Sequence, residues 1–194
     1  MIVPILIVKS RKHSAASSIL YIRMENVLNY SPGKEPKVGI PMAMNYKDYY
    51  DQQREESWQY QDFICRELLK EGIVLQNLQS QKWQYKNENL LGLEIKQDKL
   101  SEKTGNLYIE TAEKSDPSNA EFVPSGIYRN DGTWLYGIGT YRYFFIFSKK
   151  TLKTVDRQLE GLGFERKYKE TSNGFLIPKE KAESLAERYF EFEY

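Results

Sequence analysis

The feature of the chain that most constrains its fold is a change of hydrophobic period near Gly72. Before this glycine, apolar residues follow helical spacing over residues 51–71, and Gly72 stands where a helix commonly ends. From residue 90, apolar and charged residues alternate through the segment LLGLEIKQD, which is the period of a strand with one buried face. A chain of 194 residues that holds both patterns has room for one domain of mixed class. We therefore expect an α/β (α+β) fold with a central mixed β-sheet flanked by helices.

The remaining elements follow from the same periods and from the positions of proline and glycine. Strands are expected at residues 2–8, 106–112, 133–138, 141–148, 164–169 and 174–177, a loop at 31–42, and helices at 149–159 and 178–189. Residues 90–112 should form an antiparallel hairpin. The chain is then a single domain over 1–194, with an N-terminal extension over 1–45 and a strand pair with a helix appended over 161–194.

Composition excludes several classes of function. Lys and Arg number 28 against 27 Asp and Glu, and the net charge of +1 excludes a uniformly basic coat that binds nucleic acid by charge alone. Cys65 is the only cysteine, so internal disulfides and cysteine-rich zinc sites are excluded and a reducing cytoplasm is expected. His13 is the only histidine, and no apolar run approaches the roughly 20 residues that span a membrane. Any catalysis would therefore depend on carboxylates and lysines.

Charged residues are concentrated on one face of the strand expected over residues 90–98. Glu94, Lys96 and Asp98 are spaced by two residues and so share a face of one strand. In the expected hairpin, Lys96 lies opposite Tyr108 and Glu94 lies opposite Glu110. Carboxylates that converge in this way repel each other unless a cation lies between them, and Mg²⁺ or Mn²⁺ prefers such oxygen ligands. The pattern predicts either a site for metal-assisted phosphodiester hydrolysis or a salt-bridged surface hairpin.

These residues also carry a resemblance to a known family. The segment 91–98 (LGLEIKQD) followed by 103–110 (KTGNLYIE) resembles the core hairpin of the PD-(D/E)XK nucleases. The later segment 124–127 (PSGI) resembles one that follows this hairpin in such proteins. The resemblance covers about residues 51–150. It implies a restriction-endonuclease-like fold and a Mg²⁺-dependent nuclease that cuts DNA, as restriction endonucleases and Holliday-junction resolvases do.

The motif of the family can be aligned with this sequence in two registers. Members of the family place an acid on one strand and an acidic-x-lysine motif on the next. The preferred register takes Asp98 and Glu110 as metal ligands, but Ala112 stands where the lysine belongs. Lys96 on the partner strand, or Lys114, would then supply the catalytic lysine.

The alternative register takes Glu88 as the first acid and Glu94-x-Lys96 as the complete second half. In the preferred register, Glu94 and Glu88 support the site instead. A side chain from the helix at 51–71 is expected to join it, and the candidates are Glu55, Glu56 and Gln61.

A basic helix is the expected DNA contact. Lys149, Lys150 and Lys153 lie together at the start of the helix at 149–159 and could bind phosphates. Cutting both strands of a duplex commonly needs two active sites, which makes a homodimer a candidate assembly. Because no lysine follows Glu110 at the expected position, a catalytically inactive nuclease-fold protein that binds nucleic acid or acts as a scaffold is the alternative function.

Overall fold

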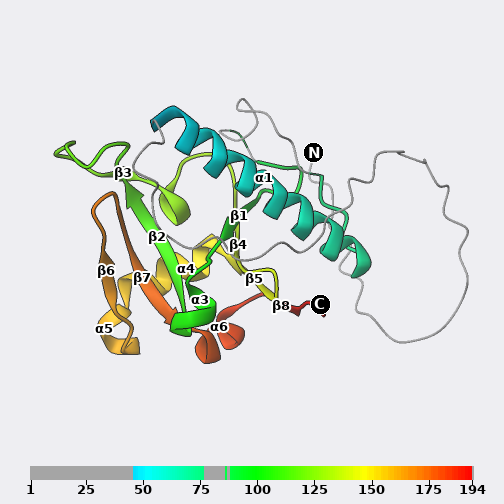
Figure 1. The fold of residues 1–194 in the computed structure, drawn as a ribbon. Coiled ribbons are helices and arrows are strands. Elements are labelled where there is room, and N and C mark those ends of the chain that lie inside the picture. The colour runs from blue at the N-terminus through cyan, green and yellow to red at the C-terminus, as the bar shows by residue number, and fades with distance from the viewer. Residues whose placement is uncertain (1–45, 77–85, 87, 194) are drawn as a thin grey trace, which may run out of the picture. The chain divides into compact units, whose positions relative to one another are not determined.

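The computed structural model describes residues 46–76, 86 and 88–193 (Figure 1). The helices are α1 (Tyr46–Lys70), α3 (Ser101–Thr104), the 3₁₀ helix η1 (Gly126–Tyr128), α4 (Lys149–Arg157), α5 (Leu159–Leu162) and α6 (Lys179–Leu185). The strands are β1 (Leu93–Gln97), β2 (Asn106–Glu113), β3 (Val123–Pro124), β4 (Leu135–Gly139), β5 (Tyr143–Ser148), β6 (Arg166–Tyr168), β7 (Ser172–Pro178) and β8 (Arg188–Glu191). The expected α+β class, with a mixed sheet flanked by helices, is confirmed.

The mixed sheet has the strand order β1-β4-β5-β8. β1 runs parallel to β4, whereas the β4–β5 and β5–β8 pairs are antiparallel. Helix α1 packs across one face of this sheet, close to β1 (Figure 1), because Tyr60, Ile64 and Leu68 recur every four residues and form one apolar stripe. The core between helix and sheet consists of Tyr60, Ile64, Leu68, Leu75, Leu93, Ile95, Phe144, Ile146 and Phe190.

A second, antiparallel sheet has the order β3-β2-β7-β6. Its buried face meets the side of the mixed sheet that α1 does not cover, and helix α4 packs into the same core. This core consists of Leu107, Ile109, Ile127, Tyr136, Ile138, Tyr143, Phe145, Phe147, Leu152, Val155, Leu159, Phe175, Ile177 and Ala182. The mixed sheet is therefore covered on both faces, by α1 on one and by the second sheet with α4 on the other.

Several expected elements are confirmed at nearly the expected bounds. The helix expected at 51–71 is α1, the aromatic strands at 133–138 and 141–148 are the antiparallel pair β4 and β5, and the basic helix at 149–159 is α4. The strand at 2–8, the loop at 31–42, the N-terminal extension over 1–45 and His13 lie outside the described residues.

The expected antiparallel hairpin over 90–112 is wrong. β1 and β2 belong to different sheets, since β1 pairs with β4 and β2 pairs with β7. The short helix α3 lies between them and ends at Gly105, whose φ of 71° places it in the left-handed region. This helical turn takes the place of a tight hairpin turn. Lys96 is consequently paired with Ile138 rather than with Tyr108, and Glu94 with Tyr136 rather than with Glu110.

The C-terminal segment over 161–194 is not an appendage. The expected strand pair is present as β6 and β7, but β7 is an interior strand of the second sheet. The expected helix from 178 to 189 ends at Leu185, because residues 188–191 form β8 at the edge of the mixed sheet. The segment therefore completes both sheets.

Candidate active site

Strand β1 carries the centre of the candidate site because its two faces differ. Leu93 and Ile95 face α1 and belong to the core on that side. Glu94 and Lys96 alternate with them and so face the side on which the second sheet lies. Glu94 is fully buried, with 0% of its side chain exposed, whereas 36% of the Lys96 side chain is exposed. β1 thus holds an acid in the interior and a base at the surface of the same face.

Three basic side chains surround Glu94. Its Oε2 lies 2.7 Å from Nζ of Lys149, and its Oε1 lies 3.1 Å from Nζ of Lys96 and 3.6 Å from the guanidinium of Arg129. Burial opposes ionisation, but these cations hold the pKa of the Glu94 carboxyl below its ordinary value of 4.5. Lys149 also supplies a side-chain hydrogen bond that lowers this pKa. Glu94 is therefore a buried, ionised carboxylate that is held by ion pairs with three basic side chains.

Arg129 links Glu94 to two further carboxylates. Its guanidinium donates hydrogen bonds to Glu88 and to Asp131. Asp131 is itself buried, and its Oδ1 accepts bonds from the backbone N–H and the hydroxyl of Thr133 at 3.0 and 2.7 Å. Burial raises the pKa of Asp131, but these hydrogen bonds outweigh that effect and lower it. The guanidinium is thus held at the meeting point of three acids.

Arg129 and Asp131 were not among the residues predicted from the sequence. They lie after η1 in an irregular stretch, where no hydrophobic period indicates which side chains turn inward. The signal that could have drawn attention to them is their position directly after the PSGI segment over 124–127, which carries part of the nuclease resemblance.

Glu88 is positioned by a buried asparagine. The Oδ1 atom of Asn89 accepts hydrogen bonds from the backbone N–H groups of Leu91 and Leu93 at 3.1 Å, and its Nδ2 donates to the carbonyl of Leu93 at 2.6 Å. Glu88 has a φ of 56°, which is uncommon for a residue with a side chain, and such strain is often found at functional sites. Burial and the neighbouring charge of Glu94 raise the pKa of the Glu88 carboxyl.

Glu110 approaches from the second sheet. Its Oε1 accepts a hydrogen bond from the hydroxyl of Ser125 at 2.8 Å. Gly126 has a φ of 51° and lies so close to the Glu110 carbonyl that a Cβ at this position would collide with it. Burial lowers the pKa of Lys96, but the charges of Glu94 and Glu110 outweigh this and raise it. Glu110 is therefore electrostatically coupled to Lys96 even though their strands are not paired.

These residues form one continuous network, which we call the acid–base cluster. Its members come from β1, β2, the start of α4 and the two irregular segments that flank β1 and η1. The cluster comprises Glu88, Glu94, Lys96, Glu110, Arg129, Asp131 and Lys149. The carboxylates outnumber the basic groups by one.

Asp98 lies at the end of β1 and has a different role. Its Oδ2 accepts a hydrogen bond from the backbone N–H of Tyr108 at 2.8 Å, and its Oδ1 accepts one from the N–H of Leu100 at 3.2 Å. Burial raises the pKa of its carboxyl despite these bonds. The carboxylate thus connects the end of β1 to β2. It also accepts a hydrogen bond from the backbone of Leu100, the residue before α3. The structure therefore brings Glu88, Glu94, Lys96 and Glu110 together and gives Asp98 backbone partners instead.

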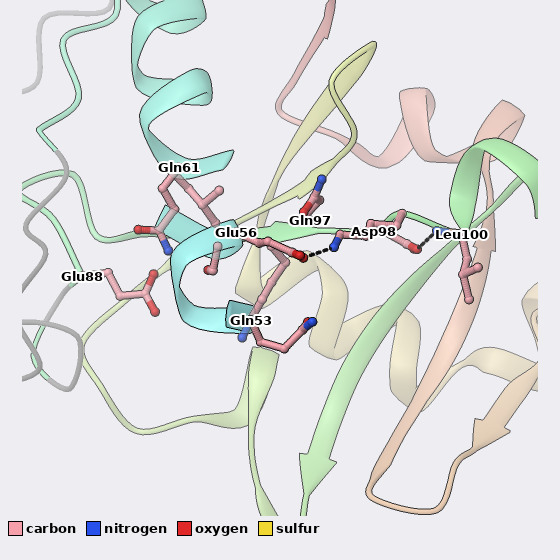
Figure 2. A pocket seen from close by; sticks show the side chains of 11 residues that line it. Gln53, Glu56, Gln61, Glu88, Gln97, Asp98 and Leu100 are labelled. Atoms are coloured by element: carbon pink, nitrogen blue, oxygen red, sulfur yellow. Dashed lines mark hydrogen bonds and ion pairs between the residues drawn. The ribbon is translucent and has the colours of Figure 1, made fainter. Parts of the chain in front are cut away.

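A pocket opens beside the acid–base cluster, with a volume of about 390 Å³. Glu88 and Lys96 line it from the cluster, and Asp98 and Lys99 line it from the end of β1. The remaining polar lining comes from Gln97 and from one side of α1, which contributes Gln53, Glu56, Ser57 and Gln61 (Figure 2).

Of the three helical candidates for the site, Glu56 and Gln61 line this pocket. The dashed line from Glu56 in Figure 2 marks its ion pair with Lys99. Glu55 does not line the pocket and instead accepts a hydrogen bond from Gln59 along the helix at 3.2 Å.

The predicted three-lysine DNA contact is wrong at Lys149. Only 4% of its side chain is exposed, and its Nζ contacts Glu94 and donates to the carbonyl of Gly126 at 3.0 Å. Lys150 is exposed, and Lys153 is half-buried with its Nζ 5.3 Å from the centre of the Tyr128 ring. The first lysine of the trio is therefore part of the acid–base cluster. Lys114, the other candidate for the catalytic lysine, donates to the carbonyls of Pro117 and Asn119 in a loop.

Among the described residues, no three His, Cys, Asp or Glu side chains are arranged so that together they could hold a metal ion. In that same part of the chain, no helix has the length and apolar character needed to cross a membrane. Comparison of the chain with protein-family models, with curated proteins and with solved structures found no match.

Proposed function

We propose that the chain is a Mg²⁺-dependent nuclease that hydrolyses phosphodiester bonds in DNA at the acid–base cluster. The observation that carries this proposal is Glu94, a fully buried and ionised carboxylate that shares one face of β1 with Lys96. Burying a charge in this way costs stability, so such a group is a candidate for function rather than for folding. DNA is chosen as the substrate because the segments 91–98 and 103–110 resemble PD-(D/E)XK nucleases in sequence, although β1 and β2 do not pair with each other.

The carboxylates of the acid–base cluster suit Mg²⁺ better than they suit a metal that needs several protein ligands. Mg²⁺ is commonly held by one or two carboxylates, and waters and substrate phosphates complete its coordination. One guanidinium nitrogen of Arg129 contacts both Glu88 and Glu94, so these two carboxylates lie near each other. These two residues would hold the ion. The bound ion would supply a water of lowered pKa and charge neutralisation at the phosphate.

The chain's own side chains would then orient the substrate. Lys96 is the member of the cluster with a substantially exposed side chain on β1, and it also lines the pocket. Because its pKa is raised by the neighbouring carboxylates, Lys96 stays protonated and can stabilise negative charge that develops on the scissile phosphate. Arg129 and Lys149 would keep the carboxylates ionised in the interior.

This assignment corresponds to the register with Glu88 as the first acid and Glu94-x-Lys96 as the second half. It is favoured over the register that begins at Asp98 because the Asp98 oxygens accept backbone hydrogen bonds from Tyr108 and Leu100. A carboxylate with those partners is better placed to fix local structure than to bind a metal.

Cleavage assays on linear and supercoiled DNA test the proposal. Cleavage should require Mg²⁺ or Mn²⁺ and stop when a chelator is added. Lys96→Ala should lower the rate by roughly 100-fold or more, because it removes a charge that stabilises the transition state. Lys181→Ala, at an exposed lysine on α6, is the matched control and should cleave like the natural chain. Cleavage that persists without divalent ions would contradict the proposal.

Calorimetric titration with Mn²⁺ separates the two registers. Glu88→Gln should weaken Mn²⁺ binding strongly, since it removes one ligand charge with little change in shape, whereas Asp98→Asn should retain binding. The opposite pattern, with binding lost only in Asp98→Asn, would instead support the register in which Asp98 and Glu110 are the metal ligands.

A second candidate function is a catalytically inactive protein that binds nucleic acid or acts as a scaffold. The ion pairs that surround Glu94 favour this reading, since Lys149, Lys96 and Arg129 already neutralise part of the charge a metal would meet. DNA binding without cleavage under any divalent ion, together with an unchanged melting temperature on addition of Mn²⁺, would establish this alternative.

A further inference from the structure

Lys169 lies in the turn between β6 and β7 and differs from the other basic side chains of this strand pair. Arg166 forms an ion pair with Asp156 at 2.8 Å, and Lys167 forms one with Glu165 at 3.9 Å. Lys169 is exposed, and within the described residues it has no ion pair with a carboxylate. Its ammonium is therefore a charge that the fold leaves available to an anion from solvent.

The ring of Tyr108 holds this ammonium in place. Nζ of Lys169 lies 3.4 Å from the centre of the ring, which is a cation–π contact. The Tyr108 hydroxyl shares a hydrogen bond with the hydroxyl of Ser172 at 3.0 Å. The ring also lies close to Gly174, where a Cβ would be 2.9 Å from two of the ring carbons. Because neighbours on β7 fix the ring, the ring in turn restricts the flexible lysine side chain.

Tyr108 places Lys169 beside the acid–base cluster. Tyr108 and Glu110 are two residues apart on β2 and share its half-buried face. Glu110 is the acid of the second sheet that is electrostatically coupled to Lys96. The backbone N–H of Tyr108 donates to Asp98, which follows Lys96 by two residues. Tyr108 is thus one step along β2, roughly 7 Å, from the acid coupled to Lys96.

The acids near Lys169 do not cover its ammonium. Both oxygens of Asp98 accept backbone hydrogen bonds, and Glu110 accepts one from Ser125. Burial raises the pKa of Asp98, and the charge of Lys169 is among the effects that oppose this rise. Asp98 and Glu110 are half-buried, whereas Lys169 is exposed. Glu170 follows in the turn, and in the part of the chain that the structure describes it has no ion pair with Lys169.

We propose that Lys169, held by Tyr108, binds a phosphate of the DNA strand close to the phosphate that is cut. The proposal rests on the proposed nuclease function, because it places the cut phosphate at Lys96. An ammonium has three donors and neutralises one phosphate without reading a base, so it fixes the position of the strand rather than its sequence. Tyr108 is a positioning residue that acts through Lys169.

Fluorescence anisotropy with a labelled DNA duplex at several salt concentrations tests the phosphate contact. Ca²⁺ replaces Mg²⁺, and a gel checks that the duplex stays intact. Lys169→Ala should lower the slope of log affinity against log salt by about one unit, as expected for the loss of one phosphate contact. Lys181→Ala on α6 removes another exposed lysine and should leave the slope unchanged. Calorimetry should show the same Mn²⁺ binding in the natural chain and in Lys169→Ala, because Lys169 is not a member of the acid–base cluster.

Variants of Tyr108 test the positioning. Tyr108→Phe keeps the ring and should bind the duplex like the natural chain. Tyr108→Leu removes the ring and should weaken binding by about two- to fivefold, the range expected for an exposed cation–π contact. When Lys169 is already alanine, Tyr108→Leu should have no further effect, because the two residues act as a unit. An equal loss in both backgrounds would overturn the role of Tyr108 as a positioning residue.

The phosphate contact and the nuclease proposal fail in different ways. If the natural chain cuts DNA and Lys169→Ala keeps the natural salt slope, the phosphate contact is overturned and the nuclease stands. If the chain cuts no DNA with any divalent ion but its binding still depends on Lys169, the nuclease proposal fails and the phosphate contact is supported. A natural chain that does not bind the duplex overturns the phosphate contact.

Discussion

Two adjacent lysines at the start of α4 occupy opposite environments. Lys149 is buried against Glu94, with Nζ 2.7 Å from Oε2, and Lys150 points to solvent. Removing one partner of a buried ion pair leaves the other charge without compensation, which is far more costly than removing a surface charge. The two residues therefore make a matched pair for mutation.

Lys149→Met should lower the free energy of unfolding by about 3–5 kcal/mol, because Glu94 would lose its nearest cation. Lys150→Met should leave the free energy of unfolding nearly unchanged. Urea denaturation of both variants measures the difference. Similar stability of the two variants would mean that Glu94 is not held as a charged group in the fold.

As the pH falls, Mn²⁺ binding should be lost before the native fold, because Glu88 takes up a proton at a higher pH than Glu94. The pKa of Glu88 is raised above 4.5 by burial and by Glu94, so it takes up a proton first. The pKa of Glu94 lies below 4.5, so its contribution to stability persists until the pH falls through that lower value. Mn²⁺ binding should then disappear on acidification while near-ultraviolet circular dichroism still reports the native fold. Simultaneous loss of both signals would contradict this order.

The environments of single residues were the part of the site least accessible from the sequence. Alternation over 90–98 correctly placed Glu94 and Lys96 on one face of β1. It could not show that Lys149 turns inward, because a lysine at a helix start is normally solvated and only its contact with Glu94 explains its burial. Arg129 was missed for the same reason, since its position depends on partners far away in the sequence.

At the scale of elements, pairing was harder to predict than the elements themselves. Local periodicity identifies a strand but does not choose its partner, and β1 pairs with β4, some 40 residues later, instead of with the next strand. Helix α3 causes this difference, because its turn directs β2 away from β1 and towards β7. The helix α1 was predicted well because its apolar stripe faces a single surface.

The edge strand β8 offers a test of how much the C-terminal segment stabilises the mixed sheet. Phe190 is 9% exposed and packs into the core beneath α1. Phe190→Ala should lower the free energy of unfolding by about 3 kcal/mol through loss of buried area and the cavity left behind. Tyr168→Ala on the other edge strand, β6, removes a side chain that is 71% exposed and should have little effect. Thermal or urea unfolding compares the two, and equal losses would contradict the assigned packing of β8.

For the whole molecule, the near balance of charge makes any DNA affinity depend on a few local ion pairs with phosphates. The net charge is only +1, and helix α4 begins at the acid–base cluster, with Lys150 exposed and Lys153 half-buried on its first turns. Replacing both with alanine should reduce the slope of log affinity against log salt by about two units, because each lysine would neutralise one phosphate. Fluorescence anisotropy at several salt concentrations measures the slope. An unchanged slope would place the DNA-binding surface elsewhere.

The position of β7 inside the second sheet has a consequence for how the protein is made. Strand β2, which carries Glu110, pairs along most of its length with residues 172–178, and β5 pairs with residues 188–191. A ribosome that has released the chain only as far as α4 has already exposed every member of the acid–base cluster, but not the strands that hold them in register. The cluster therefore lacks the strands that pair with β2 and β5 until residues 172–191 have been made. A cutting activity built on it would stay silent until then.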